Sequence, residues 1–527
     1  MHRRMRICGY AVMVCIMAWG VYVRIGGLSE RPFWIDEAWV AYAVTHQSYG
    51  ELWRQTELPM PPLFAVTTKL LGQLVSPPEL GLRLLPAVCG IACVPLIYPI
   101  LRTVRIPRII AYGGMAMCAS SPVMVYWSRE LKQYEVEALF AVLLALIVFR
   151  VRSCSQPQGR WLNRMCVILL CLLGPWFGYG TVFPTLALLT LLLVLRPERG
   201  DRQESVITAV LGLAALGVSA GGVWHLAAAA QASNPALIKF TSPWLVDPLN
   251  MHSWLRAGAY AALSTAITVF PVDVLVTHVQ GYEGIALIAI VAAIVWLAVL
   301  IGLFGWPGRG RWAMACWIFL PWLMLLSASI AHYYPFAQAR MMVCVVVSIV
   351  PTLALGVTRI ARECSLVLTG RGRPGLVAGL ILACVPAIYM IHVPTQPERS
   401  AYQDFPTVLE VLRHERQPGE LVAVTLLAVP CVRYYADNLC EPMVYMPTTA
   451  GTLPLANFDS KMWAVETVQR AGSRWWILAN GNPGDRHRQY LLQTAQQHGY
   501  QFKVVAEAGV QSDYGLAQLI RVQGGFR

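Results

Sequence analysis

The chain contains few charged residues. Asp, Glu, Lys and Arg make up 13% of its 527 residues, whereas 57% are hydrophobic. Soluble globular domains carry about 25% charged residues, so this composition excludes an ordinary soluble protein and indicates an integral membrane protein. A formal net charge of +13 would otherwise suggest nucleic-acid binding, but Lys and Arg in cytoplasmic loops explain it better in so apolar a chain.

Several functional motifs are also missing. The sequence has no glycine-rich phosphate fingerprint, which argues against a nucleotide site. It shows no histidine cluster with metal-ligand spacing and no internal repeat. Most of the 14 cysteines lie in apolar segments, where cysteine acts as a small hydrophobic residue. Cys431 and Cys440 lie in a polar region, and the sequence leaves open whether they form a disulfide.

Long apolar segments recur along the first three quarters of the chain. The first follows the basic MHRRMR and is not followed by a small-residue cleavage site, so we expect an uncleaved transmembrane helix with a cytoplasmic N-terminus. Further segments have the length of a membrane span, which gives about eleven spans in all. The expected spans are 7–23, 84–101, 109–127, 134–149, 165–180, 182–195, 205–230, 283–304, 312–331, 341–358 and 375–392.

Arginine-rich loops occur at every second connection between these segments. The positive-inside rule places such loops in the cytoplasm, so the remaining connections must face outward. These outward loops are 24–83, 128–133, 226–282 and 332–340. The predicted fold is therefore a polytopic α-helical membrane protein. Its transmembrane domain covers residues 1–392, and residues 393–527 lie outside the cytoplasm.

The C-terminal region has a different pattern. PTVLEVLRHE and RQYLLQTAQQHGY read as helices, while ELVAVTLL, RWWILANG, FKVVAEA and LAQLIRV read as strands. Strands that alternate with helices indicate a small α/β domain. Its role could be acceptor recognition or a cap over the membrane part.

Two adjacent acids stand out in the first outward loop, within RPFWIDEAWVAYAV (31–44). In a structural interpretation, Asp36 caps a helix and Glu37 lies in its first turn, where the helix dipole favours a negative charge. A carboxylate fixed at a helix start is also well aimed to act as a general base. Glu57 is a further acid of this loop.

The turn before the 134–149 segment carries Arg129, Glu130, Lys132 and Tyr134. Charges so close to hydrocarbon are costly and indicate function, although an interfacial belt of snorkelling cations is the alternative. Arg340, at the end of the 332–340 loop, could bind a phosphate or anchor the adjacent span.

These motifs resemble those of the C-type integral-membrane glycosyltransferases. The similarity is strongest to the bacterial relatives of protein O-mannosyltransferases and to the aminoarabinose transferase of lipid A. The matching residues are Asp36-Glu37, Pro61-Pro62-Leu63, Tyr126, Ser128, Glu130, Lys132 and Tyr134. The resemblance implies a polyprenyl-phosphate sugar donor, inversion at the anomeric carbon, a site on the outward face of the bacterial inner membrane, and Asp36 as the base.

The expected chemistry assigns a role to each group. Asp36 would take the proton of the acceptor hydroxyl, and cations would hold the departing phosphate. Lys132, Arg340, Arg129 and Tyr134 are the candidates for the phosphate, while Tyr126, Ser128, Glu130 and Glu57 would support the site. A divalent cation is possible, with Asp36, Glu37 and Glu130 as its candidate ligands.

Three other functions fit the composition. A transporter or flippase for lipid-linked sugars also needs many spans, but such proteins usually show repeats and midplane charges, whereas here the acids lie in outward loops. A surface-polysaccharide polymerase or ligase would use the same donors, and a non-catalytic scaffold would bind a partner through the α/β domain. The sugar and the acceptor (a lipid, a glycan or a protein) are not specified by the sequence.

Overall fold

The computed structural model describes residues 2–54, 60–103, 105–153, 157–195, 201–232, 245–266, 282–305, 310–334, 336, 342–369, 403–425, 428–436, 443–445, 448–449, 453–454, 460–480, 485–508 and 516–524. The chain forms two compact units. The first consists of Met1–Gly26, Arg83–His225 and Thr241–Thr395, and the second of Gly27–Leu82, Leu226–Phe240 and Gln396–Arg527. Most of the first loop expected to face outward thus folds with the C-terminal region, and the expected division at residues 392 and 393 remains a prediction.

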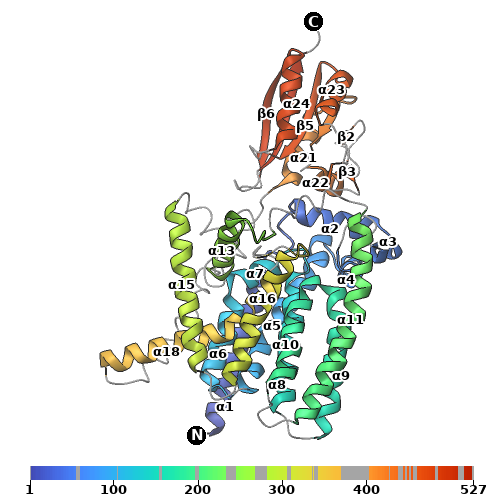
Figure 1. Ribbon diagram of the computed structural model, residues 1–527. Helices are drawn as coiled ribbons and strands as arrows, with labels where there is room; N and C mark the ends of the chain where they lie inside the picture. The colour runs from blue at the N-terminus through green and yellow to red at the C-terminus, as the bar shows by residue number, and fades with distance from the viewer. Residues whose placement is uncertain are drawn as a thin grey trace. The chain divides into compact units, whose positions relative to one another are not determined.

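The first unit is helical (Figure 1). Its helices are α1 (His2–Ile25), α5 (Pro78–Thr103), α6 (Arg108–Ser120), α7 (Pro122–Ser128), α8 (Tyr134–Ser153), α9 (Pro157–Phe177), the 3-10 turn η1 (Tyr179–Thr181), α10 (Val182–Val194), α11 (Arg202–Ala232), α13 (Met251–Ala266), α15 (Tyr282–Gly305), α16 (Gly310–Ile330), α17 (Val343–Val346) and α18 (Ile349–Thr369). The first ten expected spans overlap these helices, and 375–392 lies outside the described residues.

Three of the described helices are long and apolar enough to cross a membrane by themselves: Pro78–Thr103, Arg202–Ala227 and Arg311–Ile330. The pair α6 and α7 forms a fourth candidate, bent by 50°. The bend coincides with Pro122, which has no N–H for the helical ladder. The chain is therefore a multi-pass membrane protein, and the total of about eleven spans remains a prediction.

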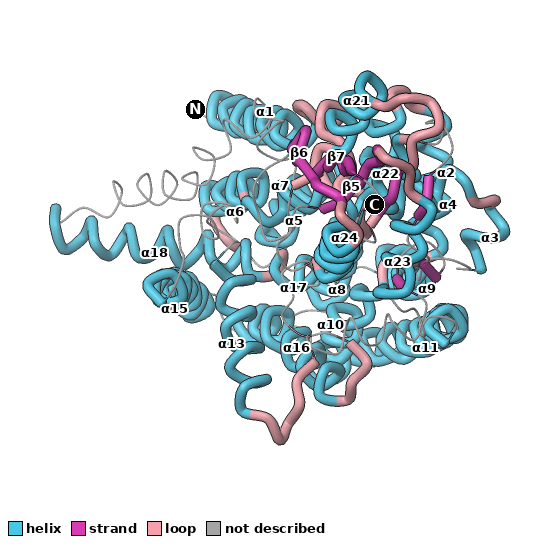
Figure 2. The backbone as a smooth tube through the Cα atoms, turned by 90° about the horizontal axis from the view of Figure 1, so that it is seen from above, coloured by secondary structure: helices cyan, strands magenta, loops and turns pink. Residues whose placement is uncertain are grey.

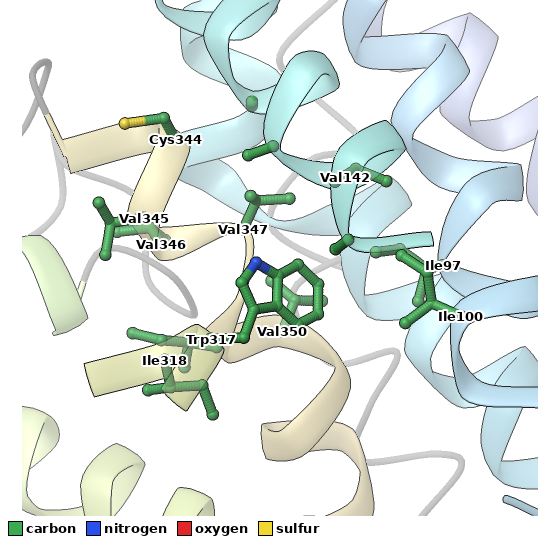
Figure 3. Close-up of a cluster of buried hydrophobic side chains, with 14 of the residues drawn as sticks. Ile97, Ile100, Val142, Trp317, Ile318, Cys344, Val345, Val346, Val347 and Val350 are labelled. Carbon is green, nitrogen blue, oxygen red and sulfur yellow. The ribbon is translucent and has the colours of Figure 1, made fainter. Parts of the chain in front are cut away.

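An apolar core holds the first unit together. Trp317 of α16 is 0% exposed, and its ring centroid lies 5.7 Å from that of Phe149 on α8. Figure 3 shows the indole pointing toward Val347 and Val350. A well-filled core of this kind fixes the positions of the helix ends.

The second unit contains a five-stranded sheet with the strand order β2-β1-β5-β7-β6. Its strands are β1 (Val422–Val424), β2 (Met443–Tyr445), β5 (Arg474–Asn480), β6 (Tyr500–Ala508) and β7 (Ala517–Gly524). The first three strands of the order run parallel, with Ala423 between Val444 and Ile477, and β7 runs antiparallel to both of its neighbours. β3 (Thr448–Thr449) and β4 (Leu453–Pro454) form a separate pair. All four strands expected from the sequence are present.

Helices lie beside the strands of this sheet (Figure 2). In the C-terminal part they are α21 (Phe405–Glu415), α22 (Val429–Tyr435), α23 (Ser460–Arg470) and α24 (Arg486–Gln497). Residues 27–82 supply α2 (Ile35–His46), α3 (Tyr49–Arg54) and α4 (Pro62–Leu74). α2 packs against α22 and α4, so the helix that carries the two acids is an integral part of this unit.

Candidate functional site

Asp36 and Glu37 both lie in the first turn of α2, which begins at Ile35 with Trp34 as its N-cap. The expectation that Asp36 caps the helix was wrong, because the helix begins at Ile35, two residues earlier than an N-cap at Asp36 would require. The carbonyl oxygen of Trp34 accepts from the backbone N–H groups of Glu37, at 2.9 Å, and Ala38, at 2.8 Å. Both carboxylates therefore lie in the first turn, at the positive end of the helix dipole.

Glu37 is held by a buried arginine that the sequence reasoning did not identify. Nη2 of Arg31 lies 3.0 Å from Oε1 and 3.1 Å from Oε2 of Glu37. The two side chains are 4% and 0% exposed, so each neutralises a charge that would be costly to bury alone. Asp36 is only partly buried. Glu37 is therefore engaged by Arg31, and Asp36 is the more accessible acid.

The thiol of Cys431, on α22, lies close to both acids. It donates to the carbonyl oxygen of Phe33, with Sγ and O 3.8 Å apart. Burial, together with the negative charges of Glu37 and Asp36, raises the pKa of this thiol well above its ordinary value. Cys431 is a free thiol, and Cys440 lies outside the described residues.

Lys69 of α4 holds the other end of α2. Its Nζ donates to the carbonyl oxygen of Val44 at 2.7 Å and to that of Thr45 at 3.2 Å. The last carbonyl groups of a helix have no helical partner, so this buried ammonium fixes the C-terminal end of α2.

Arg129 holds the end of another helix. Its Nη1 donates to the carbonyl oxygens of Val23, at 3.1 Å, and Gly26, at 2.7 Å, where α1 ends. The side chain is 5% exposed. Arg129 therefore joins the turn at 128–134 to the end of α1. Its roles as a phosphate ligand or as a snorkelling cation remain predictions.

A second arginine makes the reciprocal connection. Arg24 of α1 donates through Nη2 to the carbonyl oxygen of Cys118, at 3.1 Å, and through Nη1 to that of Ala119, at 2.9 Å. In an unbroken helix, the residue at position 122 would donate to Cys118, but Pro122 has no N–H. Arg24 thus satisfies the backbone at the bend between α6 and α7, which non-helical backbone at membrane depth requires.

The rest of this turn is closely packed. Ser128 and Glu130 are 0% exposed and Tyr134 is 4% exposed. Ser128 Oγ donates to the carbonyl oxygen of Val125 at 2.7 Å, and the ring of Tyr134 lies 5.1 Å from that of Trp127. Tyr126 and Lys132 are partly buried, which leaves Lys132 as the more accessible cation of the turn.

Two of the expected site residues, Glu57 and Arg340, lie outside the described residues. Within the described part of the chain, no group of three or more His, Cys, Asp and Glu side chains could hold a metal ion. Both oxygens of Glu37 accept from Arg31. A divalent cation with Asp36, Glu37 and Glu130 as ligands remains a prediction.

The sequence reasoning also missed two buried acids at the start of α8, Glu135 and Glu137. Oε1 of Glu137 accepts from the N–H of Gly180 at 3.0 Å. Among the described residues, neither oxygen of Glu135 has a hydrogen-bond partner. Both acids lie within three residues of Tyr134, the last residue of the motif, and their apolar neighbours in EVEALF were the available signal.

Comparisons with known proteins place the whole chain in context. Residues 59–224 match the family described as dolichyl-phosphate-mannose-protein mannosyltransferase. No curated protein sequence matches the chain. Among solved structures, ArnT from Cupriavidus metallidurans in the apo state is similar at 12% identity and a TM-score of 0.55, over 99% of this chain and 98% of that one.

Two further structures are similar at the same level. ArnT from Cupriavidus metallidurans bound to undecaprenyl phosphate has 12% identity and a TM-score of 0.51, over 97% of each chain. The Archaeoglobus fulgidus oligosaccharyltransferase, in complex with Zn and sulfate, has 12% identity and a TM-score of 0.51, over 89% of this chain and 68% of that one. At this identity the likeness concerns the fold.

Proposed function

Because the chain has the fold of the C-type integral-membrane glycosyltransferases, we propose that it is an inverting glycosyltransferase. It moves a sugar from a polyprenyl-phosphate donor to an acceptor hydroxyl at the outer face of the bacterial cytoplasmic membrane. The observation that carries the proposal is the difference in exposure between the two acids. Glu37 is buried and binds Arg31, whereas Asp36 is only partly buried. An inverting transfer needs one general base, and the greater exposure of Asp36 supports that role for it.

The reaction follows from the donor chemistry. Asp36 accepts the proton of the acceptor hydroxyl as its oxygen attacks the anomeric carbon from the face opposite the phosphate. The bond between this carbon and the phosphate oxygen breaks, and the lipid phosphate leaves with the electron pair. Phosphate is a good leaving group, so a second carboxylic acid is not needed, unlike in glycoside hydrolysis.

The leaving phosphate requires positive charge. Lys132 is the best candidate in the turn at 128–134, because it is only partly buried. Tyr134 and Arg340 remain proposed phosphate ligands. Arg129 would act indirectly, since it donates to the end of α1 and thereby fixes the turn that carries Lys132. The ArnT structure bound to undecaprenyl phosphate supports a lipid-phosphate donor.

The test compares two neutralised acids of the first outward loop. Purified protein is given a panel of polyprenyl-phosphate sugars and acceptor lipids, glycans and peptides, and release of lipid phosphate is followed for wild type, Asp36→Asn and Glu30→Gln. Loss of a general base costs about 10²- to 10⁴-fold in rate, and we expect this loss for Asp36→Asn alone. Glu30 is exposed, so Glu30→Gln controls for loss of charge in the same loop.

Equal rates for wild type and Asp36→Asn would exclude Asp36 as the base. Absence of release with every donor and acceptor, combined with movement of the lipid-linked sugar across vesicle membranes, would favour a flippase. The proposed topology is tested separately, by labelling Arg105→Cys with a membrane-impermeant reagent. Arg105 is exposed and belongs to a loop expected in the cytoplasm, so labelling of intact spheroplasts would contradict the topology.

A further inference from the structure

The helix that carries the two acids does not form its own N-terminal cap. The first N–H groups of an α-helix have no partner within the helix, and a Ser, Thr, Asp or Asn side chain normally satisfies one of them. The N-cap of α2 is Trp34, whose side chain makes no capping hydrogen bond. The backbone around Trp34 must therefore find its partners elsewhere.

Side chains from the C-terminal region provide these partners. The N–H of Ile35 donates to Oε1 of Gln403 at 3.2 Å, and the N–H of Phe33 donates to the hydroxyl of Tyr435 at 2.7 Å. The carbonyl oxygen of Phe33 accepts from the thiol of Cys431. Three backbone groups within the three residues before Asp36 are thus bound by side chains of one distant region.

The sheet of the same unit fixes these side chains. Tyr435 and Cys431 belong to α22, the next helix after β1 in the chain. Thr425, the residue after β1, donates its N–H to the carbonyl oxygen of Leu478 on β5 at 3.0 Å. Gln403 is 0% exposed. The next residue, Asp404, donates its N–H to the carbonyl oxygen of Ala508 at the end of β6. Aromatic contact adds to this, since the ring of Phe33 lies 5.2 Å from that of Tyr434.

We infer that the C-terminal region sets the position of the catalytic acid, with Tyr435 and Gln403 as positioning residues for Asp36. This inference rests on the proposed function. The two residues act on the reaction only through the start of α2, because their hydrogen bonds go to its backbone. A displacement of about 1 Å at a reacting group can lower a rate 100-fold, so loss of one backbone bond has a measurable effect on catalysis.

The experiment uses a matched pair of tyrosines. Tyr435→Phe removes the hydroxyl that binds Phe33, and Tyr500→Phe removes a hydroxyl of the same unit that binds the carbonyl oxygens of Ala471 and Gly472 at 3.3 and 3.2 Å. We expect Tyr435→Phe to lower kcat roughly 10- to 100-fold with KM for the lipid donor unchanged. Tyr500→Phe leaves kcat unchanged.

A double variant separates positioning from a general structural effect. If Tyr435 acts through Asp36, then adding Tyr435→Phe to Asp36→Asn lowers the residual rate no further, whereas independent effects multiply. Gln403→Leu is expected to behave like Tyr435→Phe in both backgrounds. Equal effects of Tyr435→Phe and Tyr500→Phe, or a multiplicative double variant, would overturn the inference.

Amide hydrogen exchange provides a readout that does not depend on transfer. The peptide that covers residues 33–38 should exchange faster in Tyr435→Phe than in wild type or Tyr500→Phe, because a backbone donor at the start of α2 has lost its acceptor. Unchanged exchange would refute the positioning role even if the wild type transfers sugar. Faster exchange in a protein without any transfer activity would instead retain the role and refute the proposed function.

Discussion

Replacing Glu37 by Gln should strongly destabilise the second compact unit. The variant removes the carboxylate of Glu37 from its ion pair with the guanidinium of Arg31, a side chain that is 4% exposed. Loss of one partner from a buried ion pair costs about 3–5 kcal/mol. For a folded unit of 150–250 residues, each kcal/mol corresponds to about 2–4 °C in Tm, so the expected decrease is roughly 6–20 °C.

Thermal unfolding of the purified protein in detergent, followed by tryptophan fluorescence, measures this decrease. Glu30→Gln is the control, because Glu30 is exposed and its loss should change Tm little. The double variant Arg31→Met with Glu37→Gln should recover most of the loss, since both members of this buried ion pair are then replaced. Two results would refute the reasoning about a broken buried ion pair. One is an equal Tm for Glu37→Gln and Glu30→Gln, and the other is a double variant that is no more stable than Glu37→Gln.

Two further predictions concern packing and pH. A Cβ at Gly178 would overlap Cγ of Glu137, whereas none of the surrounding atoms lies within 4 Å of one at Gly217. By thermal unfolding, Gly178→Ala should cost about 1–3 kcal/mol and Gly217→Ala nothing. Burial raises the pKa of Asp485 despite the lowering effect of the hydrogen bond from the Arg488 N–H, so the folded state binds the proton more tightly. Stability from this group is therefore present below the unfolded pKa of about 3.9 and lost as pH rises through the folded value. Tm should therefore fall as the pH rises through the folded pKa of Asp485, and Asp485→Asn should make this fall smaller. The same dependence of Tm on pH in Asp485→Asn and wild type would contradict the prediction.

The sequence pattern predicted the elements well where local chemistry decides them. The strand at 474–480 and the helix at 405–415 follow from apolar runs and periodicity, and the resemblance to C-type membrane glycosyltransferases is confirmed at the level of fold. The start of α2 was misplaced by two residues, because Asp is a common N-cap and Trp is not. Here the tertiary partners of the backbone replaced the local signal.

The surroundings of the acids could not be predicted in the same way. Arg31 and Glu37 are six residues apart, with Arg31 outside the helix, so no helical spacing indicates their contact. No sequence pattern indicates a role for Gln403 or Tyr435. Only the folded chain brings them to the backbone of Ile35 and Phe33. The catalytic role of Asp36 and the phosphate role of Lys132 remain predictions.

The cap of α2 also has a consequence in time. Phe33 and Tyr435 are 402 residues apart in the chain, and Ile35 and Gln403 are 368 apart. At a synthesis rate of about 5–20 residues per second, the ribosome makes the acids roughly 20–80 s before it makes the side chains that hold them. A nascent chain can thus insert its first helices while the start of α2 is still unsupported. Catalytic competence would be among the last properties that the growing chain acquires.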